Sequence, residues 1–108
     1  MSYLVYYDAD AVLELEGLKG RQERKAMFTA VEKLRALGPK LVPPHMKPLK
    51  GEGALCELRP RAGQSQVRPI YRRVGGDYVI LAIAIEADKA DFDAAAAEAR
   101  RRLSRYVA

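Results

Sequence analysis

Lysine and arginine side chains gather in the middle of the sequence, where they could hold phosphate groups. Between residues 40 and 73 the acidic residues are only Glu52 and Glu57. The basic residues of this segment are Lys40, Lys47, Lys50, Arg59, Arg61, Arg68, Arg72 and Arg73. A guanidinium stays charged and its fixed donors fit a phosphate bidentately, whereas a lysine supplies a point charge. We therefore expect one face of the protein to bind a polyanion, with Arg72 and Arg73 among the phosphate-binding residues.

The spacing of the arginines predicts which of them lie together. Residues two apart on a strand share a face, so Glu57 and Arg59 lie on one face of their strand. Arg68 begins the same alternation on the next predicted strand. If the two segments pair as a hairpin, Arg59 and Arg68 share a face that helices leave open, with Lys47 and Lys50 in the loop at its rim. The alternative is a solvated face on which Glu57 simply pairs with an arginine.

Other kinds of active site have little support in the sequence. His45, beside two prolines in a loop, is either an acid or base or a surface residue. Cys56 could pair with His45 as a nucleophile, but it alternates with Leu58 toward the core, so we interpret it as a small buried hydrophobe. One cysteine and one histidine cannot supply the ligands of a zinc site, and no glycine-rich segment has phosphate-loop spacing. We expect no metal and no cofactor.

The elements that position these residues follow from hydrophobic periodicity and turn signals. Strands are predicted at 3–7, 54–59, 67–74 and 78–85, and a proline-rich loop precedes the second of them. Asp8 or Asp10 caps a first helix, a second runs over 21–37, and Asp88 or Asp91 caps the last. The order β-α-α-β-β-β-α predicts a single α+β domain over 1–108, with an antiparallel meander covered by helices on one side.

Composition limits the compartment and the class of partner. The 108 residues carry a net charge of +5, which favours nucleic acid, an acidic protein or an anionic surface. A single cysteine excludes an internal disulfide and fits a reducing cytoplasm. The start lacks a signal-peptide pattern, and the longest apolar run, 78–85, is too short to cross a bilayer. We expect a cytoplasmic protein that does not enter the membrane.

The succession "LRALGPKLVPPHMKPLKGEGALCELRP" followed by "VRPIYRR" resembles the RelE/ParE superfamily of bacterial type II toxins, most closely its HigB-type branch. The resembling part runs from about Leu34 to Val79, and the element order extends it over nearly the whole chain. The combination of a leucine–glycine helix end, a proline loop, "KPLKG", "ELR" and an arginine-led strand is fairly specific. The resemblance implies a RelE-like fold with an N-terminal strand, a helical hairpin, a β-meander and a C-terminal helix.

The same resemblance implies a ribosome-dependent endoribonuclease that cleaves mRNA and inhibits translation. In that family the ribose 2′-OH attacks the neighbouring phosphate, and basic residues of the sheet stabilise the transition state. Arg68 and Arg59 match the catalytic arginines, and Lys47 and Lys50 match the loop lysines that bind RNA. The implied partners are the ribosome, mRNA and a cognate antitoxin, for which we expect a helix-turn-helix protein.

The sequence departs from the family at the exit of the last strand. Glu86 and Ala87 stand where relatives carry a pair of lysines, and no histidine or tyrosine follows that strand closely. Tyr106, at the end of the last helix, is a candidate acid or base in their place. These departures keep two alternatives open: a non-catalytic ParE-type toxin that acts on DNA gyrase, and a basic binding module without toxicity.

Overall fold

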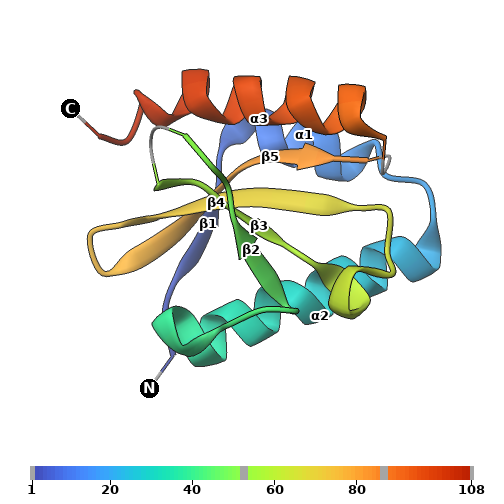
Figure 1. Cartoon of the computed structure of the whole chain (residues 1–108), viewed down its shortest axis with the longest axis horizontal. Coiled ribbons are helices and arrows are strands. Elements are labelled where there is room, and N and C mark those ends of the chain that lie inside the picture. Colours follow the sequence, from blue (N-terminus) through green and yellow to red (C-terminus); the bar gives the residue numbers. More distant parts are fainter. Residues whose placement is uncertain (1, 52–53, 86–87, 108) are drawn as a thin grey trace.

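The computed structural model describes residues 2–51, 54–85 and 88–107 and places five strands in one sheet (Figure 1). The strands are β1 (Val5–Tyr7), β2 (Met46–Pro48), β3 (Cys56–Leu58), β4 (Arg68–Val74) and β5 (Asp77–Ala84). The helices are α1 (Ala9–Glu16), α2 (Arg21–Leu37) and α3 (Lys89–Leu103), with 3-10 helices η1 (Gly38–Lys40) and η3 (Pro60–Gly63). The strand order is β1-β5-β4-β3-β2. The predicted α+β fold class is confirmed.

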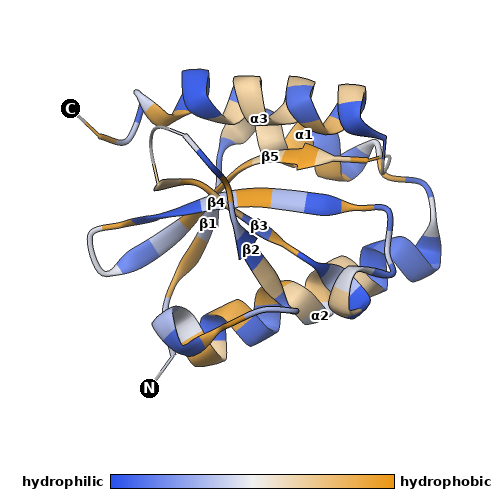
Figure 2. Ribbon diagram, in the orientation of Figure 1, coloured by the Kyte–Doolittle hydropathy of each residue, from blue (hydrophilic) through white to orange (hydrophobic). Residues whose placement is uncertain are grey.

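The sheet carries a hydrophobic core on each face, so the expectation that helices cover one side was wrong. On one face, called the α2 face, Ile80 of β5 packs with Met27 and Leu34 of α2. On the opposite face, called the α3 face, Leu81 of β5 packs with Ala99 of α3. Apolar residues fill nearly all of β5, and a strand that is apolar on both faces needs cover on both (Figure 2).

Two strands differ from the sequence-based expectation. β1 pairs with β5 in parallel, so the sheet is mixed, because the connection between them passes through other elements and not through a hairpin. β2 falls within the predicted proline-rich loop and pairs antiparallel with β3. Its proline, Pro48, is tolerated because β2 lies at the edge of the sheet, where a missing donor leaves no partner unpaired.

The helix ends follow the predicted capping chemistry. The side chain of Asp8 accepts a hydrogen bond from the backbone N–H of Asp10 at 2.8 Å, and Asp88 caps α3 in the same way. Gly38 ends α2 with a φ of 51°, and an added Cβ there would collide with the ring of Tyr3. Within the ranges that the structure describes, no helix combines the length and apolarity needed to span a bilayer.

An ion pair closes the free edge of β5 beyond the short strand β1. The backbone N–H of Ile83 donates to Glu14 of α1 at 2.9 Å, and the carbonyl of Leu81 accepts from Arg102 of α3 at 2.9 Å. Glu14 and Arg102 themselves form an ion pair at 2.9 Å. These contacts satisfy backbone groups that a sheet edge leaves unpaired, and they join α1 to α3.

Candidate nucleic-acid interface

Arg59 and Arg68 lie on one face of the sheet, next to each other on adjacent strands. Glu57 of β3 is opposite Ile70 of β4, and continuing this antiparallel register places Arg59 opposite Arg68. Ile70 packs in the core of the α3 face, so Arg68, two residues away, points to that face as well. Burial lowers the pKa of the Arg68 guanidinium, the charge of Arg59 lowers it further, and Glu57 acts in the opposite direction. The three charges therefore form one electrostatic group.

Different acceptors hold the two guanidinium groups. Arg59 Nη1 donates to Glu57 Oε1 at 3.0 Å, and 29% of the Arg59 side chain stays exposed. Arg68 donates through Nη2 to the carbonyl of Gly63 at 2.9 Å and through Nη1 to the carbonyl of Ser65. The side-chain rotamers of both arginines are thus fixed before any ligand binds, which lowers the entropic cost of holding one.

The loop that supplies these carbonyls is strained. Arg61 and Ala62 have φ values of 54° and 55°, in the left-handed region that residues with a Cβ rarely adopt. Gly63 has a φ of 95°, and an added Cβ would lie 2.6 Å from Arg59 Nη2. Strain of this kind clusters at binding and catalytic sites, where the surrounding structure maintains it. The loop therefore acts as the support of the arginine pair.

One more cation borders the pair, and two others lie farther along the strands. Lys47 of β2 is opposite Glu57, so it shares the α3 face and is exposed, and Lys50 follows it in an exposed loop. Arg100 of α3 reaches the same loop, since its Nη2 lies 3.8 Å from the place of a Cβ added to Gly51. Arg100 was not among the residues predicted from the sequence. Its spacing from Ala96, four residues before it on the core stripe, would have placed it at the border of the buried face.

Two other predicted residues, Arg73 and Tyr106, lie away from the pair, and Arg72 lies farther along β4. Arg72 is on the α3 face, four residues from Arg68. Arg73 is on the α2 face, with its guanidinium carbon 5.8 Å from the ring centroids of both Tyr3 and Tyr78. Alternation along a strand separates neighbouring residues in this way.

The hydroxyl of Tyr106 donates to the carboxylate of Asp8 at 2.7 Å. Burial and the bond to Asp8 raise the pKa of Tyr106 to about 12. Asp8 is fully buried, and its backbone N–H donates to Ile80, whereas Arg68 is opposite Ala84, four residues farther along β5. The structure therefore does not bring Tyr106 to the arginine pair.

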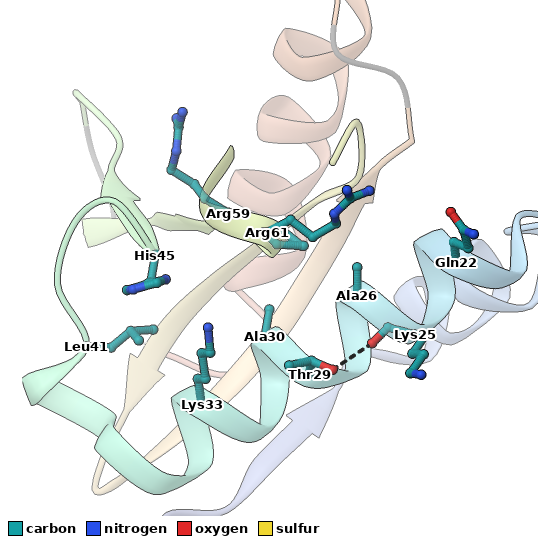
Figure 3. Close-up of a pocket in the computed structure, with 11 residues that line it drawn as sticks. Gln22, Lys25, Ala26, Thr29, Ala30, Lys33, Leu41, His45, Arg59 and Arg61 are labelled. Atoms are coloured by element: carbon teal, nitrogen blue, oxygen red, sulfur yellow. Dashed lines mark hydrogen bonds between the residues drawn. The ribbon is translucent and has the colours of Figure 1, made fainter. Parts of the chain in front are cut away.

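His45 and Cys56 face away from the pair as well. The backbone N–H of Arg59 donates to the carbonyl of His45 at 3.0 Å, yet the imidazole points into a cavity from which the Arg59 side chain turns away (Figure 3). Cys56 packs against the core of the α2 face, where burial raises its pKa although Tyr71 partly offsets this. A nucleophile pair of Cys56 and His45 has no support in this geometry. Glu86 and Ala87 lie outside the described residues.

The arrangement can bind an anion strongly without a metal or cofactor. None of the described residues accepts a hydrogen bond from Nε or Nη2 of Arg59, although both atoms lie beside Gly63, so these donors keep capacity for a ligand. Two guanidinium groups against one carboxylate leave positive charge at the site, and Lys47, Lys50 and Arg100 extend it along the sheet and α3. Such a row of cations suits the backbone of a nucleic acid.

Comparisons with known proteins agree with this fold. The family described as Phage derived protein Gp49-like (DUF891) matches residues 14–104. The structure of E. coli toxin RelE, solved in the free state as a double arginine-to-alanine mutant, superposes with a TM-score of 0.69. It shares 19% sequence identity, and the match covers 95% of this chain and 99% of that one. A search of curated proteins finds no match. The chain belongs to the Gp49-like family, within the RelE superfamily of toxins of toxin–antitoxin systems.

Proposed function

We propose that this toxin is a ribosome-dependent endoribonuclease that cleaves mRNA and inhibits translation. The observation that carries the proposal is the convergence of Arg59 and Arg68 on the α3 face, with guanidinium donors that no described residue uses and with Lys47 beside them. RNA lies on this face, and the ribose 2′-OH attacks the adjacent phosphate as its proton is lost to solvent. The bond from phosphorus to the 5′-oxygen of the next nucleotide breaks, that oxygen takes up a proton, and the products carry a 2′,3′-cyclic phosphate and a 5′-hydroxyl. The pair binds the phosphoryl oxygens as negative charge develops on them.

Arg68 is the main stabiliser of the transition state in this proposal. Two backbone carbonyls fix it, and a preorganised donor aimed at developing charge needs no reorganisation during the reaction. One donor of this kind is worth about 2–4 kcal/mol. Arg59 completes the clamp, while Lys47 beside it and Lys50 farther along the sheet hold the RNA backbone.

A second candidate is a non-catalytic, ParE-type toxin that acts on DNA gyrase. The observation that favours it is the placement of the two candidate acids or bases: Tyr106 is bonded to Asp8, and His45 points into a separate cavity. A basic surface without a proton donor binds a phosphate backbone but gives little help to a leaving oxygen. The same arginine pair then serves binding alone.

The test compares Arg68→Ala with Arg21→Ala, which removes an exposed arginine of α2. We expect induced wild-type protein to arrest growth and cut mRNA in phase with codons, as seen by primer extension. Arg68→Ala should reduce cleavage about 30- to 1000-fold, the rate equivalent of 2–4 kcal/mol, and Arg21→Ala should not. Intact transcripts together with blocked supercoiling by gyrase would support the second candidate. Equal toxicity of both variants would contradict any role of the arginine pair.

We further propose a cognate antitoxin of helix-turn-helix type, with the ribosome and mRNA as the other partners. Membership of a toxin family supports the existence of an antitoxin, and the helix-turn-helix type is the part that we propose. The neighbouring reading frame tests it directly. Co-expression of a small helix-turn-helix protein from that frame should restore growth, whereas an unrelated neighbour would contradict this choice of antitoxin.

A further inference from the structure

A cavity of about 470 Å³ lies between α2 and η3, on the other side of the chain from the guanidinium group of Arg59 (Figure 3). Its floor is apolar and consists of the small residues Ala26 and Ala30 of α2 together with Leu41 and Pro60. Ala30, Leu41 and Pro60 are themselves buried, so the floor is firmly packed. The α2 positions on this cavity run from Gln22 to Lys33, which is about 16 Å along the helix. The cavity is therefore an elongated groove beside three turns of α2.

The rim of the groove is basic. Lys25 and Lys33 come from α2, Arg61 from η3 and His45 from the loop before β2. Among the described residues no carboxylate lines the groove, and Lys25, Lys33 and Arg61 form no ion pair with another described residue. An apolar floor between unpaired cations is complementary to a ligand that is apolar on one side and acidic at its flanks.

We propose that this groove docks an acidic amphipathic helix of a protein partner. Alanines in the floor let a second helix approach closely, and Leu41 and Pro60 offer apolar contact to its aliphatic side chains. Lys25 and Lys33 are eight residues apart, about 12 Å on α2, so carboxylates two turns apart on the docked helix meet both. Nucleic acid fits less well, because no tyrosine, phenylalanine or tryptophan lines the groove for bases to stack on.

The docking site borders the surface proposed for RNA at Arg59, which lines the groove although its guanidinium points away from it (Figure 3). Lys25 and Lys33 belong to α2 and take no part in the arginine pair, which lies on the α3 face. The two proposals can therefore fail independently, since substitutions in the groove leave the donors of Arg59 and Arg68 in place. A partner held in the groove would sit against His45 and the η3 loop, and so next to the support of the pair.

The experiment uses a blocked 15-residue helical peptide with leucine and alanine on one stripe and glutamates seven residues apart beside it. Its binding to the full chain is measured by fluorescence anisotropy against a peptide of the same composition with the glutamates on the opposite face. We expect Lys33→Glu to weaken binding of the first peptide at least about tenfold more than Lys19→Glu. Both variants reverse one exposed lysine, so they share the same net charge.

A second pair of variants tests shape without changing charge. Ala26→Phe fills the groove and should abolish peptide binding, whereas Ala97→Phe, at an exposed position of α3, should not. Circular dichroism checks that both variants stay folded. Three results would each overturn the proposal. The wild-type chain does not bind the peptide, Lys33→Glu and Lys19→Glu weaken peptide binding equally, or Lys33→Glu abolishes binding of a uridine-rich oligonucleotide and leaves peptide binding unchanged.

Discussion

Arg68 and Arg59 differ in the charge that they offer to a ligand, because their partners differ. Arg68 is held by the neutral carbonyls of Gly63 and Ser65, so its charge is not neutralised, while Arg59 shares its charge with Glu57. A phosphate therefore gains more from Arg68 than from Arg59. The period of two along a strand was enough to predict that these residues share a face. The carbonyl contacts could not be predicted, since they depend on the left-handed turn at Arg61 and Ala62.

Substitution of Gly63 by alanine should damage both stability and binding. The backbone there has a φ of 95°, and the new Cβ would lie 2.6 Å from Arg59 Nη2, so the loop or the guanidinium must move. We expect a loss of about 1–3 kcal/mol in the free energy of unfolding, measured by urea denaturation, and weaker binding of single-stranded RNA.

Gly76→Ala is the matched control for the glycine substitution. Gly76 lies in the turn between β4 and β5, and nothing is within 4 Å of a Cβ added there. We expect its free energy of unfolding to change by no more than about 0.5 kcal/mol, with unchanged RNA affinity. If Gly63→Ala and Gly76→Ala behave alike, the η3 loop does not support the arginine pair.

At the scale of elements, strong periodic signals predicted α2 and β5, and weak ones failed at β2. A three-residue edge strand that contains a proline has too little pattern to stand out from a loop, and its pairing with β3 is a long-range property. The residues of β5 are buried on both faces, but the sequence-based prediction placed helices on one side of the sheet only and therefore missed the second core. Arg102 lies near the C-terminal end of α3, where cations complement the helix dipole, and it is buried.

Arg102→Met should destabilise the fold through the edge of β5. The substitution leaves Glu14 without its ion-pair partner and the Leu81 carbonyl without a donor, and only 7% of the Arg102 side chain is exposed. Breaking a buried pair by removing one partner costs about 3–5 kcal/mol, and because Glu14 is 30% exposed we expect the lower end. Urea denaturation monitored by circular dichroism measures the change.

The double variant Glu14→Gln/Arg102→Met separates the charge from the packing. Glutamine keeps an acceptor for the N–H of Ile83 but removes the uncompensated negative charge, so the double variant should be more stable than Arg102→Met alone. Arg101→Met, at an exposed neighbouring position, should be close to neutral. If Arg102→Met lowers the free energy of unfolding no more than Arg101→Met does, then α1 and α3 are joined by other contacts.

Across the whole molecule, two of the acidic residues near the start of the chain, Asp8 and Glu14, are engaged in contacts within the structure. Asp8 is buried with Arg105 and Tyr106 against it, and Glu14 pairs with Arg102. These pairs hold α1 to α3 and do not face the arginine pair. The net charge of +5 is consequently left on the outer surfaces, where cations outnumber acids on the α3 face and no described acid lines the groove beside α2. The sequence shows the excess but not which acids are neutralised.

Binding of RNA on the α3 face should depend steeply on salt. If about four phosphates are neutralised by the arginine pair and its bordering cations, the logarithm of the association constant should fall with the logarithm of salt concentration at a slope near −3. Arg68→Ala should reduce the steepness by about 0.7, because one phosphate contact releases that share of counterions from a single strand.

Arg73→Ala is the control: its guanidinium lies over Tyr3 and Tyr78 on the other face, so the slope should stay that of the wild type. Filter binding of a short oligonucleotide over a range of salt concentrations measures all three slopes. A flat profile, or equal slopes for Arg68→Ala and Arg73→Ala that both differ from wild type, would mean that the nucleic acid does not follow the α3 face.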